Sequence, residues 1–361
     1  MRKSTAALMV SGMLVVCLFP AWGRLLPESD HTVTEENRNL SRFPDAETPL
    51  AEWPGAVENW FGDRLAFRSE AIRFSSLFEF TEVKMAVEGR NGWLYYLGNG
   101  SKEDMLRRIT LSSAEKESIR AAQAETARRL SEAGAAYVVL ICPDKQTIYP
   151  EYLPDVFRNV SGQSRMDQIL PVLREIPGIT VVDPRDEMLR AKGEVPLYYL
   201  TDTHWNRCGA WIACKAACAE ITRVLPSFRV PEGAEISEPY AREQGDLAQM
   251  LNRRDMTEFE VDVTLPGTDL RTEEIPNPDN PLRNTIIYEN PAHPELPRAV
   301  VFHDSFGEAL RPFLAAGFSR VVFAWSDHVD MKIVNEENPD IVIQEYVERL
   351  CFYGLPVPPA E

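Results

Sequence analysis

The stretch Val300-Val-Phe-His-Asp-Ser-Phe-Gly307 joins an apolar β-strand pattern to a short polar turn and a glycine. Such turns lie at the carboxyl ends of strands in open α/β sheets, where binding sites form. Ser305 is thus expected at the top of a sheet, with backbone N–H groups of Ser305 and its successors placed to hold an oxyanion. Capping of the following helix by Ser305 explains this stretch equally well.

A second polar stretch, Tyr198-Tyr-Leu-Thr-Asp-Thr-His-Trp-Asn206, precedes a predicted helix. Asp202 and His204 are two residues apart, and residues i and i+2 of an extended segment point to the same side. The Asp202 carboxylate can then accept a hydrogen bond from one imidazole nitrogen while the other nitrogen faces a serine. We therefore predict a triad of Ser305, His204 and Asp202.

The chain has five histidines, so His204 has few competitors. His303 belongs to a predicted buried strand and His293 to a proline-rich segment. His328 follows a predicted strand in Trp325-Ser-Asp-His328, which makes it the rival base to test.

Short apolar runs alternate with amphipathic helical patterns from Asn91 onward, which is typical of a mostly parallel α/β sheet. Residues 226–298 are rich in proline and glycine and interrupt this alternation, so we interpret them as an insertion containing one half-buried hairpin strand, Phe259 to Leu265. Strands are expected at Trp93 to Leu97, Ala136 to Cys142, Ile179 to Val182, Val300 to His303, Arg320 to Ala324 and Ile341 to Ile343. Helices are expected at Ser113 to Ala133, Asn206 to Val224 and Gly307 to Ala316.

The N-terminal residues have the pattern of an export signal. Arg2 and Lys3 precede an almost continuous apolar run from Ala6 to Pro20. Residues 1–23 are expected to be a cleaved signal peptide or a retained membrane anchor, and both alternatives remain open. Residues 24–88 are predicted to be a docking segment with an aromatic helical face, residues 89–355 the main domain, and residues 356–361 a tail.

Composition limits the function. The 361 residues carry 38 Lys and Arg against 55 Asp and Glu, a net charge of −17 that argues against a general nucleic-acid binder. Loss of Arg2 and Lys3 with a signal would make the exported part −19. Cys208, Cys214 and Cys218 share one predicted helix with poor disulfide geometry and without further soft metal ligands, so buried thiols are expected.

The Asp202-Thr-His204-Trp205 and His303-Asp-Ser305-Phe306 stretches together resemble the AlgJ and AlgX group of alginate O-acetyltransferase proteins. The similarity continues in the same order over nearly the whole exported chain. It includes Glu36-Asn-Arg38, Asn59-Trp-Phe-Gly-Asp-Arg64, Gly92-Trp-Leu94, Pro143-Asp-Lys145, Gly245-Asp246-Leu247 and Glu348-Arg349. The chain departs from a classical SGNH serine block in having His303 where glycine is usual.

The resemblance implies an SGNH-hydrolase-like three-layer α/β sandwich with a mostly parallel sheet, in which Asp-x-His precedes the serine, plus an N-terminal helical segment. It also implies that Ser305 takes an acetyl group and passes it to a polysaccharide hydroxyl without a cofactor or metal. A periplasmic or cell-surface location and a multipass membrane acyltransferase as acetyl donor follow from the same resemblance. An acetyl-carbohydrate esterase and a noncatalytic polysaccharide-assembly protein remain alternatives.

Four further residues are candidates for substrate binding. Lys145 follows a predicted strand and could line the cleft, or could be a surface lysine paired with Asp144. Trp205 and Tyr149 are candidates for stacking on sugars, although Trp205 could instead pack in the core. Asn206 is either an oxyanion donor or, more simply, a helix cap. The acidic charge favours a neutral or less anionic glycan acceptor over alginate unless the cleft is locally basic.

Overall fold

A computed structural model describes residues 85–360 except 159, 254, 279 and 281–282. The chain divides at Lys84 into two units, of which the second, Met85–Glu361, is compact. The predicted signal or anchor (1–23) and nearly all of the predicted docking segment (24–88) therefore lie outside the described residues. The first described strand begins at Ala86, three residues before the predicted start of the main domain at 89.

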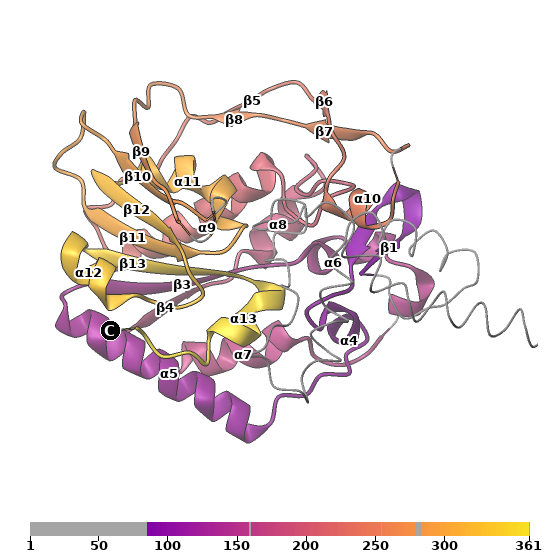
Figure 1. The fold of residues 1–361 in the computed structure, drawn as a ribbon, viewed down its shortest axis with the longest axis horizontal. Helices are drawn as coiled ribbons and strands as arrows, with labels where there is room; N and C mark the ends of the chain where they lie inside the picture. Colours follow the sequence, from indigo (N-terminus) through magenta and orange to yellow (C-terminus); the bar gives the residue numbers. More distant parts are fainter. Residues whose placement is uncertain (1–84, 159, 254, 279, 281–282, 361) are drawn as a thin grey trace, which may run out of the picture. The chain divides into compact units, whose positions relative to one another are not determined.

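The second unit is built around a seven-stranded sheet with the order β4-β3-β13-β11-β12-β10-β9 (Figure 1). Five neighbouring strands are parallel, and an antiparallel hairpin closes one edge. The α/β class and the mostly parallel sheet are thus confirmed. The strands are β3 (Ala136–Cys142), β4 (Ile179–Val182), β9 (Arg271–Ile275), β10 (Thr285–Glu289), β11 (Arg298–His303), β12 (Arg320–Trp325) and β13 (Ile341–Val347).

Helices cover both faces of this sheet and make three layers. One face packs mainly against α9 and α11, and the other against α5, α7, α12 and α13. The helices are α4 (Ser101–Met105), α5 (Ser113–Glu132), α6 (Lys145–Ile148), α7 (Arg165–Arg174), α8 (Arg185–Ala191), α9 (Arg207–Val224), α10 (Asp246–Met250), α11 (Gly307–Ala315), α12 (Met331–Glu337) and α13 (Glu348–Gly354).

Local sequence explains where these elements begin. The β3 run is apolar at every position because both of its faces are covered by helices, as parallel strands require. Helix α5 starts with a capping box in which Ser112 and Glu115 hydrogen-bond each other's backbone N–H groups. Ser112 is the cap because it has the extended backbone that a cap needs, and the helix begins at Ser113 as predicted.

The segment 226–298 is only partly an insertion. Its strands β9 and β10 extend the main sheet beyond β12, so the segment completes the core sheet. The predicted strand from Phe259 to Leu265 is also wrong in extent, since two short strands with different partners replace it. The remaining elements are β1 (Ala86–Glu88) with β2 (Leu94–Tyr96), β5 (Glu235–Ile236) with β8 (Val263–Thr264), β6 (Tyr240–Arg242) with β7 (Glu258–Glu260), and 3₁₀ helices at Arg90–Gly92, Pro150–Tyr152 and Asp155–Phe157.

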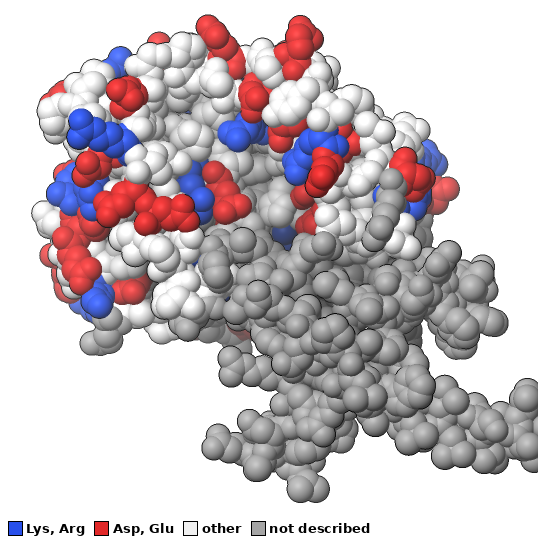
Figure 2. Space-filling model, turned by 45° about the horizontal axis from the view of Figure 1, so that its top comes forward, with Lys and Arg blue, Asp and Glu red and all other residues white. Residues whose placement is uncertain are grey.

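Four further features bear on the sequence expectations. The predicted buried thiols are confirmed: Cys208, Cys214 and Cys218 of α9 are buried, and the Sγ atoms of the last two lie 3.8 Å apart. At the carboxyl end, Ala360 forms a parallel bridge with Asp330. Among the described helices, none has the length and apolarity needed to cross a bilayer. Figure 2 shows acidic and basic side chains interspersed over the described part of one face.

Candidate active site

Ser305 lies directly after β11, between the end of that strand at His303 and the start of α11 at Gly307. Its Oγ is 2.8 Å from Nε2 of His204. Helix α11 begins without a side-chain cap. The helix-capping interpretation of Ser305 is therefore wrong, and the hydroxyl is directed to the imidazole instead.

His204 lies in the loop before α9, two residues from Asp202. Its Nδ1 is 2.7 Å from Oδ1 of Asp202, and its backbone N–H donates to the same oxygen at 2.9 Å. The segment is a tight turn and not the extended stretch that we predicted. The carboxylate bends back on its own chain, so the turn itself sets the position of the ring.

The structure thus brings the three predicted triad residues into one hydrogen-bonded chain. With the proton on Nδ1, the ring donates to Asp202 and presents the Nε2 lone pair to Ser305. Burial acts to lower the pKa of His204, but the Asp202 charge and hydrogen bond raise it above its ordinary value. The His204 side chain is 27% exposed, so a substrate can reach it.

Behind the turn lies Asp246, at the start of α10. Its Oδ1 accepts from the Thr203 backbone N–H at 2.7 Å, and its Oδ2 accepts from Oγ1 of Thr203 at 2.6 Å. Gly245 allows this approach, because a Cβ there would lie 2.2 Å from Cβ of Asp202. The role of Asp246 at the site was missed from the sequence; the available signal was the Gly245-Asp246-Leu247 similarity.

Lys145 is buried beside this turn and is not the surface lysine of our alternative prediction. Its Nζ donates to the carbonyl oxygens of Leu94 at 2.9 Å and Leu200 at 3.3 Å. Desolvation lowers its pKa to about 8, although the charges of Asp202, Asp246 and Glu258 favour the cation. Lys145 therefore supports the turn through its hydrogen bond to the Leu200 carbonyl oxygen.

Glu258 holds the other end of the same turn and was also missed from the sequence. The buried carboxylate accepts from the backbone N–H and the hydroxyl of Thr201, at 2.6 and 2.7 Å. It also accepts from the N–H of Leu200 at 3.2 Å. No local sequence pattern distinguishes Glu258 from the many exposed acids of the segment.

The backbone after Ser305 offers fewer oxyanion donors than expected. The N–H of Phe306 donates to Oδ1 of Asp304 at 2.9 Å, and that of Gly307 to the Asp304 carbonyl at 3.2 Å. Within the described part of the chain, the N–H of Ser305 donates to no other group. It is the donor that remains available for an oxyanion.

Asp304 is held on the opposite side by β13. Its Oδ2 accepts from the Val347 N–H at 2.7 Å, and its own N–H donates to Oε2 of Glu345 at 3.1 Å. The Arg349 guanidinium lies 5.2 Å from the Phe306 ring and pairs with Asp144. These contacts fix the turn that presents Ser305.

The other three predicted substrate-binding residues are structural, as Lys145 is. Tyr149 is buried, stacks on Trp93 with ring centroids 4.4 Å apart, and accepts from the Leu197 N–H. Trp205 is buried and donates to the Phe306 carbonyl at 3.1 Å. Neither ring is free to stack on a sugar, so both predictions are wrong. Asn206 caps α9 by accepting from Gly209 at 3.0 Å, as its simpler interpretation requires.

The competing histidines have other partners. His303 is buried, and burial with the Arg311 charge lowers its pKa to about 3. His293 pairs with Glu295, and the Nδ1 of His328, our rival base, lies 2.7 Å from Asp327. Ser305 is hydrogen-bonded to His204 instead.

Asp202, His204 and Asp246 also have the composition of a metal site, since they offer ligand atoms within 4.8 Å of one another. The Asp202 and His204 atoms are hydrogen-bonded to each other, and both Asp246 oxygens accept from Thr203. These hydrogen bonds account for the proximity of the three groups without assigning them to a metal.

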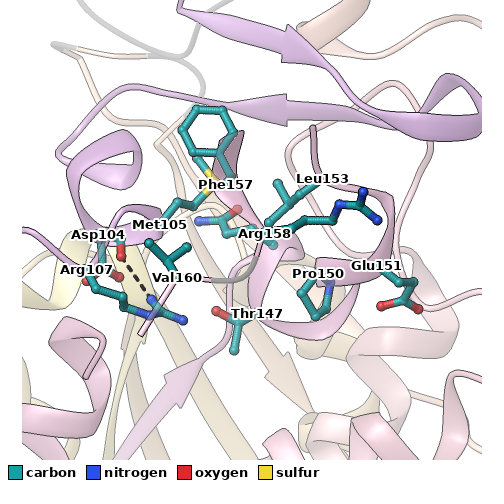
Figure 3. Close-up of a pocket in the computed structure, with 11 residues that line it drawn as sticks. Asp104, Met105, Arg107, Thr147, Pro150, Glu151, Leu153, Phe157, Arg158 and Val160 are labelled. Carbon is teal, nitrogen blue, oxygen red and sulfur yellow. Dashed lines mark hydrogen bonds between the residues drawn. The ribbon is translucent and has the colours of Figure 1, made fainter. Parts of the chain in front are cut away.

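A pocket of about 370 Å³ lies elsewhere, around α4, α6 and the 3₁₀ helices that follow α6 (Figure 3). None of the triad residues lines it. Thr147 in its wall donates to the buried Glu348, so that side chain is already engaged. The candidate active site is therefore the open carboxyl edge of the sheet and not this pocket.

One protein family matches a large part of the chain. Residues 86–275, more than half of the chain, match the family described as "SGNH hydrolase-like domain, acetyltransferase AlgX". The chain belongs to the AlgX SGNH hydrolase-like domain family. The match includes Asp202, His204 and Asp246 and ends before Ser305.

Individual relatives extend the comparison. The chain is 26% identical over 234 residues to the probable alginate O-acetylase AlgJ of Pseudomonas syringae pv. tomato, an overlap of 59% of this chain and 55% of that protein. The chain thus spans about half the length of this curated relative.

Solved structures share the SGNH hydrolase-like fold. The O-acetyltransferase domain of Pseudomonas putida AlgJ is 20% identical, with a TM-score of 0.50, covering 75% of this chain and 92% of that one. Bacillus cereus PatB1 is 16% identical, with a TM-score of 0.54, covering 73% and 96%. PatB1 has also been solved with a sulfonyl adduct, at 15% identity with the same TM-score and coverage.

Proposed function

We propose that this protein is a serine-dependent O-acetyltransferase that modifies hydroxyl groups of an exported polysaccharide. The observation that carries the proposal is the hydrogen-bonded chain from Ser305 through His204 to Asp202. This arrangement activates a serine hydroxyl for attack on an acyl group. The names of the AlgJ and AlgX relatives support acetyl as the group transferred.

In the first step, Oγ of Ser305 attacks the acetyl carbonyl carbon of an ester donor while Nε2 of His204 takes the hydroxyl proton. The Ser305 N–H stabilises the oxyanion that forms. The ester bond then breaks, the leaving oxygen takes the proton from His204, and an acetyl group remains on Ser305. Asp202 keeps the ring oriented and stabilises its cationic form throughout.

In the second step, a sugar hydroxyl attacks the acetyl-Ser305 carbonyl and gives its proton to His204. Collapse of the intermediate returns that proton to Oγ of Ser305 and releases the acetylated sugar. Water in the same position would release acetate, which is esterase chemistry. The partial exposure of His204 gives an acceptor access to the base.

The location and the donor belong to the same proposal. The apolar N-terminal run after Arg2 and Lys3 supports export to the periplasm or cell surface, by a cleaved signal or a retained anchor. A multipass membrane acyltransferase would supply acetyl groups there. Co-purification of such a protein with the full chain from membranes, lost when the N-terminal segment is replaced by a cleavable signal, tests this part.

Intact-mass measurement after exposure to an aryl acetate tests the reaction itself. We expect the wild-type protein to gain one acetyl group, and the Ser305→Ala variant to gain none. Ser227→Ala removes an exposed serine and is the matched control that should still be acetylated. Labelling that survives in Ser305→Ala would overturn the nucleophile.

The acceptor is tested by the fate of the acetyl group. If the protein is a transferase, added glycan should shorten the lifetime of acetyl-Ser305, and the acetyl group should be recovered on the glycan. An unchanged lifetime, with acetate as the product, would favour an esterase. An absence of labelling by both the aryl acetate and a sulfonyl fluoride would favour a noncatalytic polysaccharide-binding protein.

A further inference from the structure

Asp246 comes from α10, a part of the chain more than forty residues after the Asp202–His204 turn, yet both of its carboxylate oxygens are bound to that turn. Its partner is Thr203, the residue between the two triad members. The backbone N–H donates at 2.7 Å and the hydroxyl at 2.6 Å. Asp246 therefore acts on the residue that links the base to its carboxylate.

The Thr203 hydroxyl has two neighbours but only one proton to donate. Its Oγ1 is 2.6 Å from Oδ2 of Asp246 and 3.3 Å from Nδ1 of His204. An ionised carboxylate can only accept, so the proton is directed to Asp246. Nδ1 then keeps its own proton, which it donates to Asp202 at 2.7 Å.

This choice decides whether His204 can act as a base. If Thr203 donated to Nδ1, the ring proton would lie on Nε2, and Nε2 could not take the proton of Ser305. We propose that Asp246 is a positioning residue that fixes the tautomer of His204 by holding the hydroxyl proton of Thr203. The inference rests on the proposed function of the triad and adds a residue to it.

Charged groups surround this network on several sides. Asp202 and His204 face Asp246 from the turn, Lys145 adds positive charge near Asp202, and Arg349 acts on His204 from α13. Burial and the Asp202 charge raise the pKa of Asp246, while His204 and the Thr203 hydrogen bonds oppose that rise. Two donors from Thr203 are what an ionised carboxylate in this position needs.

The variant Asp246→Asn tests the proton direction with little change in shape. Its amide would donate to Oγ1 of Thr203, which turns the hydroxyl proton toward His204. We expect modification of Ser305 by phenylmethylsulfonyl fluoride to slow by at least about tenfold to 100-fold, the loss expected for one charged hydrogen bond. Glu243→Gln is the matched control, because it removes an exposed carboxylate three residues away and should react like the wild type.

The double variant Asp246→Asn/Thr203→Val separates the tautomer from a general loss of structure. Valine has no proton to offer Nδ1, so we expect the double variant to react at least several times faster than Asp246→Asn. A double variant as slow as the single one, or an Asp246→Asn variant as fast as the wild type, would overturn the inference. A wild-type protein that sulfonyl fluoride does not modify at Ser305 would instead overturn the proposed function.

A measurement on the unsubstituted protein covers the case in which Asp246→Asn does not fold. Nitrogen-15 NMR of the histidine rings, with His204 assigned by its loss in His204→Gln, reports which nitrogen carries the proton. We expect the proton on Nδ1 and an unprotonated Nε2 at a pH above the His204 pKa. The opposite tautomer would contradict the role proposed for Asp246.

Discussion

In the proposed mechanism, the contact between Asp202 and His204 determines when His204 is available as a base. Burial acts against the charged ring, but the Asp202 carboxylate raises the His204 pKa above the ordinary histidine value of about 6.5. A base must be unprotonated to take the Ser305 proton. Activity should therefore fall as the pH decreases through this raised pKa, at a higher pH than for an unpaired histidine.

Asp202→Asn tests this dependence at the level of one residue. The amide cannot stabilise the imidazolium, so the pKa of His204 should fall and the acidic limb of kcat/KM should move to lower pH. The rate at the plateau should fall by about 100-fold or more, because the ring orientation and tautomer are lost. An acidic limb that stays at the wild-type pH would exclude His204 as the titrating base, and His204→Ala should abolish the limb together with the activity.

Individual residues differ in how far their roles could be predicted. The hydrogen-bonded arrangement of the proposed triad could be predicted because a rare histidine, an acid two residues away and a serine after an apolar strand form a recognisable chemical set. The supporting roles of Lys145 and Glu258 could not be predicted, because the burial of these side chains depends on contacts with Leu94, Leu200 and Thr201. Tyr149 and Trp205 were misassigned because an aromatic ring suits a core as well as a sugar.

At the scale of elements, the start of α10 must approach the Asp202–His204 turn closely. A Cβ at position 245 would lie 2.2 Å from Cβ of Asp202 and 2.5 Å from its Oδ2. Gly245→Ala should therefore destabilise the fold by about 1–3 kcal/mol through overpacking and reduce activity by displacing Asp202. Thermal unfolding and the rate of Ser305 acetylation measure the two effects.

Gly193→Ala is the control for that substitution. A Cβ at position 193 would have no heavy atom within 4 Å, and the backbone there is not left-handed, so alanine should be neutral or stabilising by about 0.4–1 kcal/mol. Equal effects of the two substitutions would show that Asp202 does not depend on the close approach of α10.

The junction between β13 and α13 buries a carboxyl group that should remain neutral at ordinary pH. Glu348 accepts from the Asp144 N–H and the Thr147 hydroxyl, and burial, reinforced by the Asp144 charge, raises its pKa from 4.5 to about 8. At a pH between 4.5 and about 8, Glu348 keeps its proton in the folded chain and has released it in the unfolded chain. Glu348 therefore lowers stability as the pH rises through this window, by up to about 1.4 kcal/mol per pH unit.

Glu348→Gln should remove that dependence while keeping an oxygen that accepts both hydrogen bonds. Urea unfolding at about pH 5 and about pH 8 gives the comparison, and the wild type should lose more stability over this range than the variant. Glu336→Gln, which changes an exposed acid on α12, should behave like the wild type. The same loss in Glu348→Gln as in the wild type would mean that Glu348 is already ionised in the fold.

Elements with strong apolar patterns were predicted well. Strands β3 and β4 have the predicted bounds, and α9 begins one residue later because Asn206 is its cap. Strand β9 escaped prediction because every residue of Arg271-Thr-Glu-Glu-Ile275 is exposed at the edge of the sheet. An edge strand held by backbone pairing with β10 has little need of an apolar face.

At the scale of the whole second unit, the segment 226–298 has two structural roles. One part, α10 with β7, carries Asp246 and Glu258 to the turn that holds Asp202 and His204, and the other part, β9 with β10, completes the central sheet. This division explains why a proline-rich composition suggested an insertion while the segment is required by both the core and the site. Sequence periodicity shows neither role, because both depend on partners far away in the chain.

The net charge of −17 leads to a prediction about the acceptor that depends on the molecule as a whole. A protein of this charge repels a polyanion over a range of about 30 Å at 0.01 M salt but only about 10 Å at 0.1 M. The kcat/KM for a polyuronate oligosaccharide should therefore increase with added salt, while that for a neutral oligosaccharide of the same length should hardly change. A kcat/KM for the polyuronate that decreases with salt would show that basic groups near the triad outweigh the net charge of the molecule.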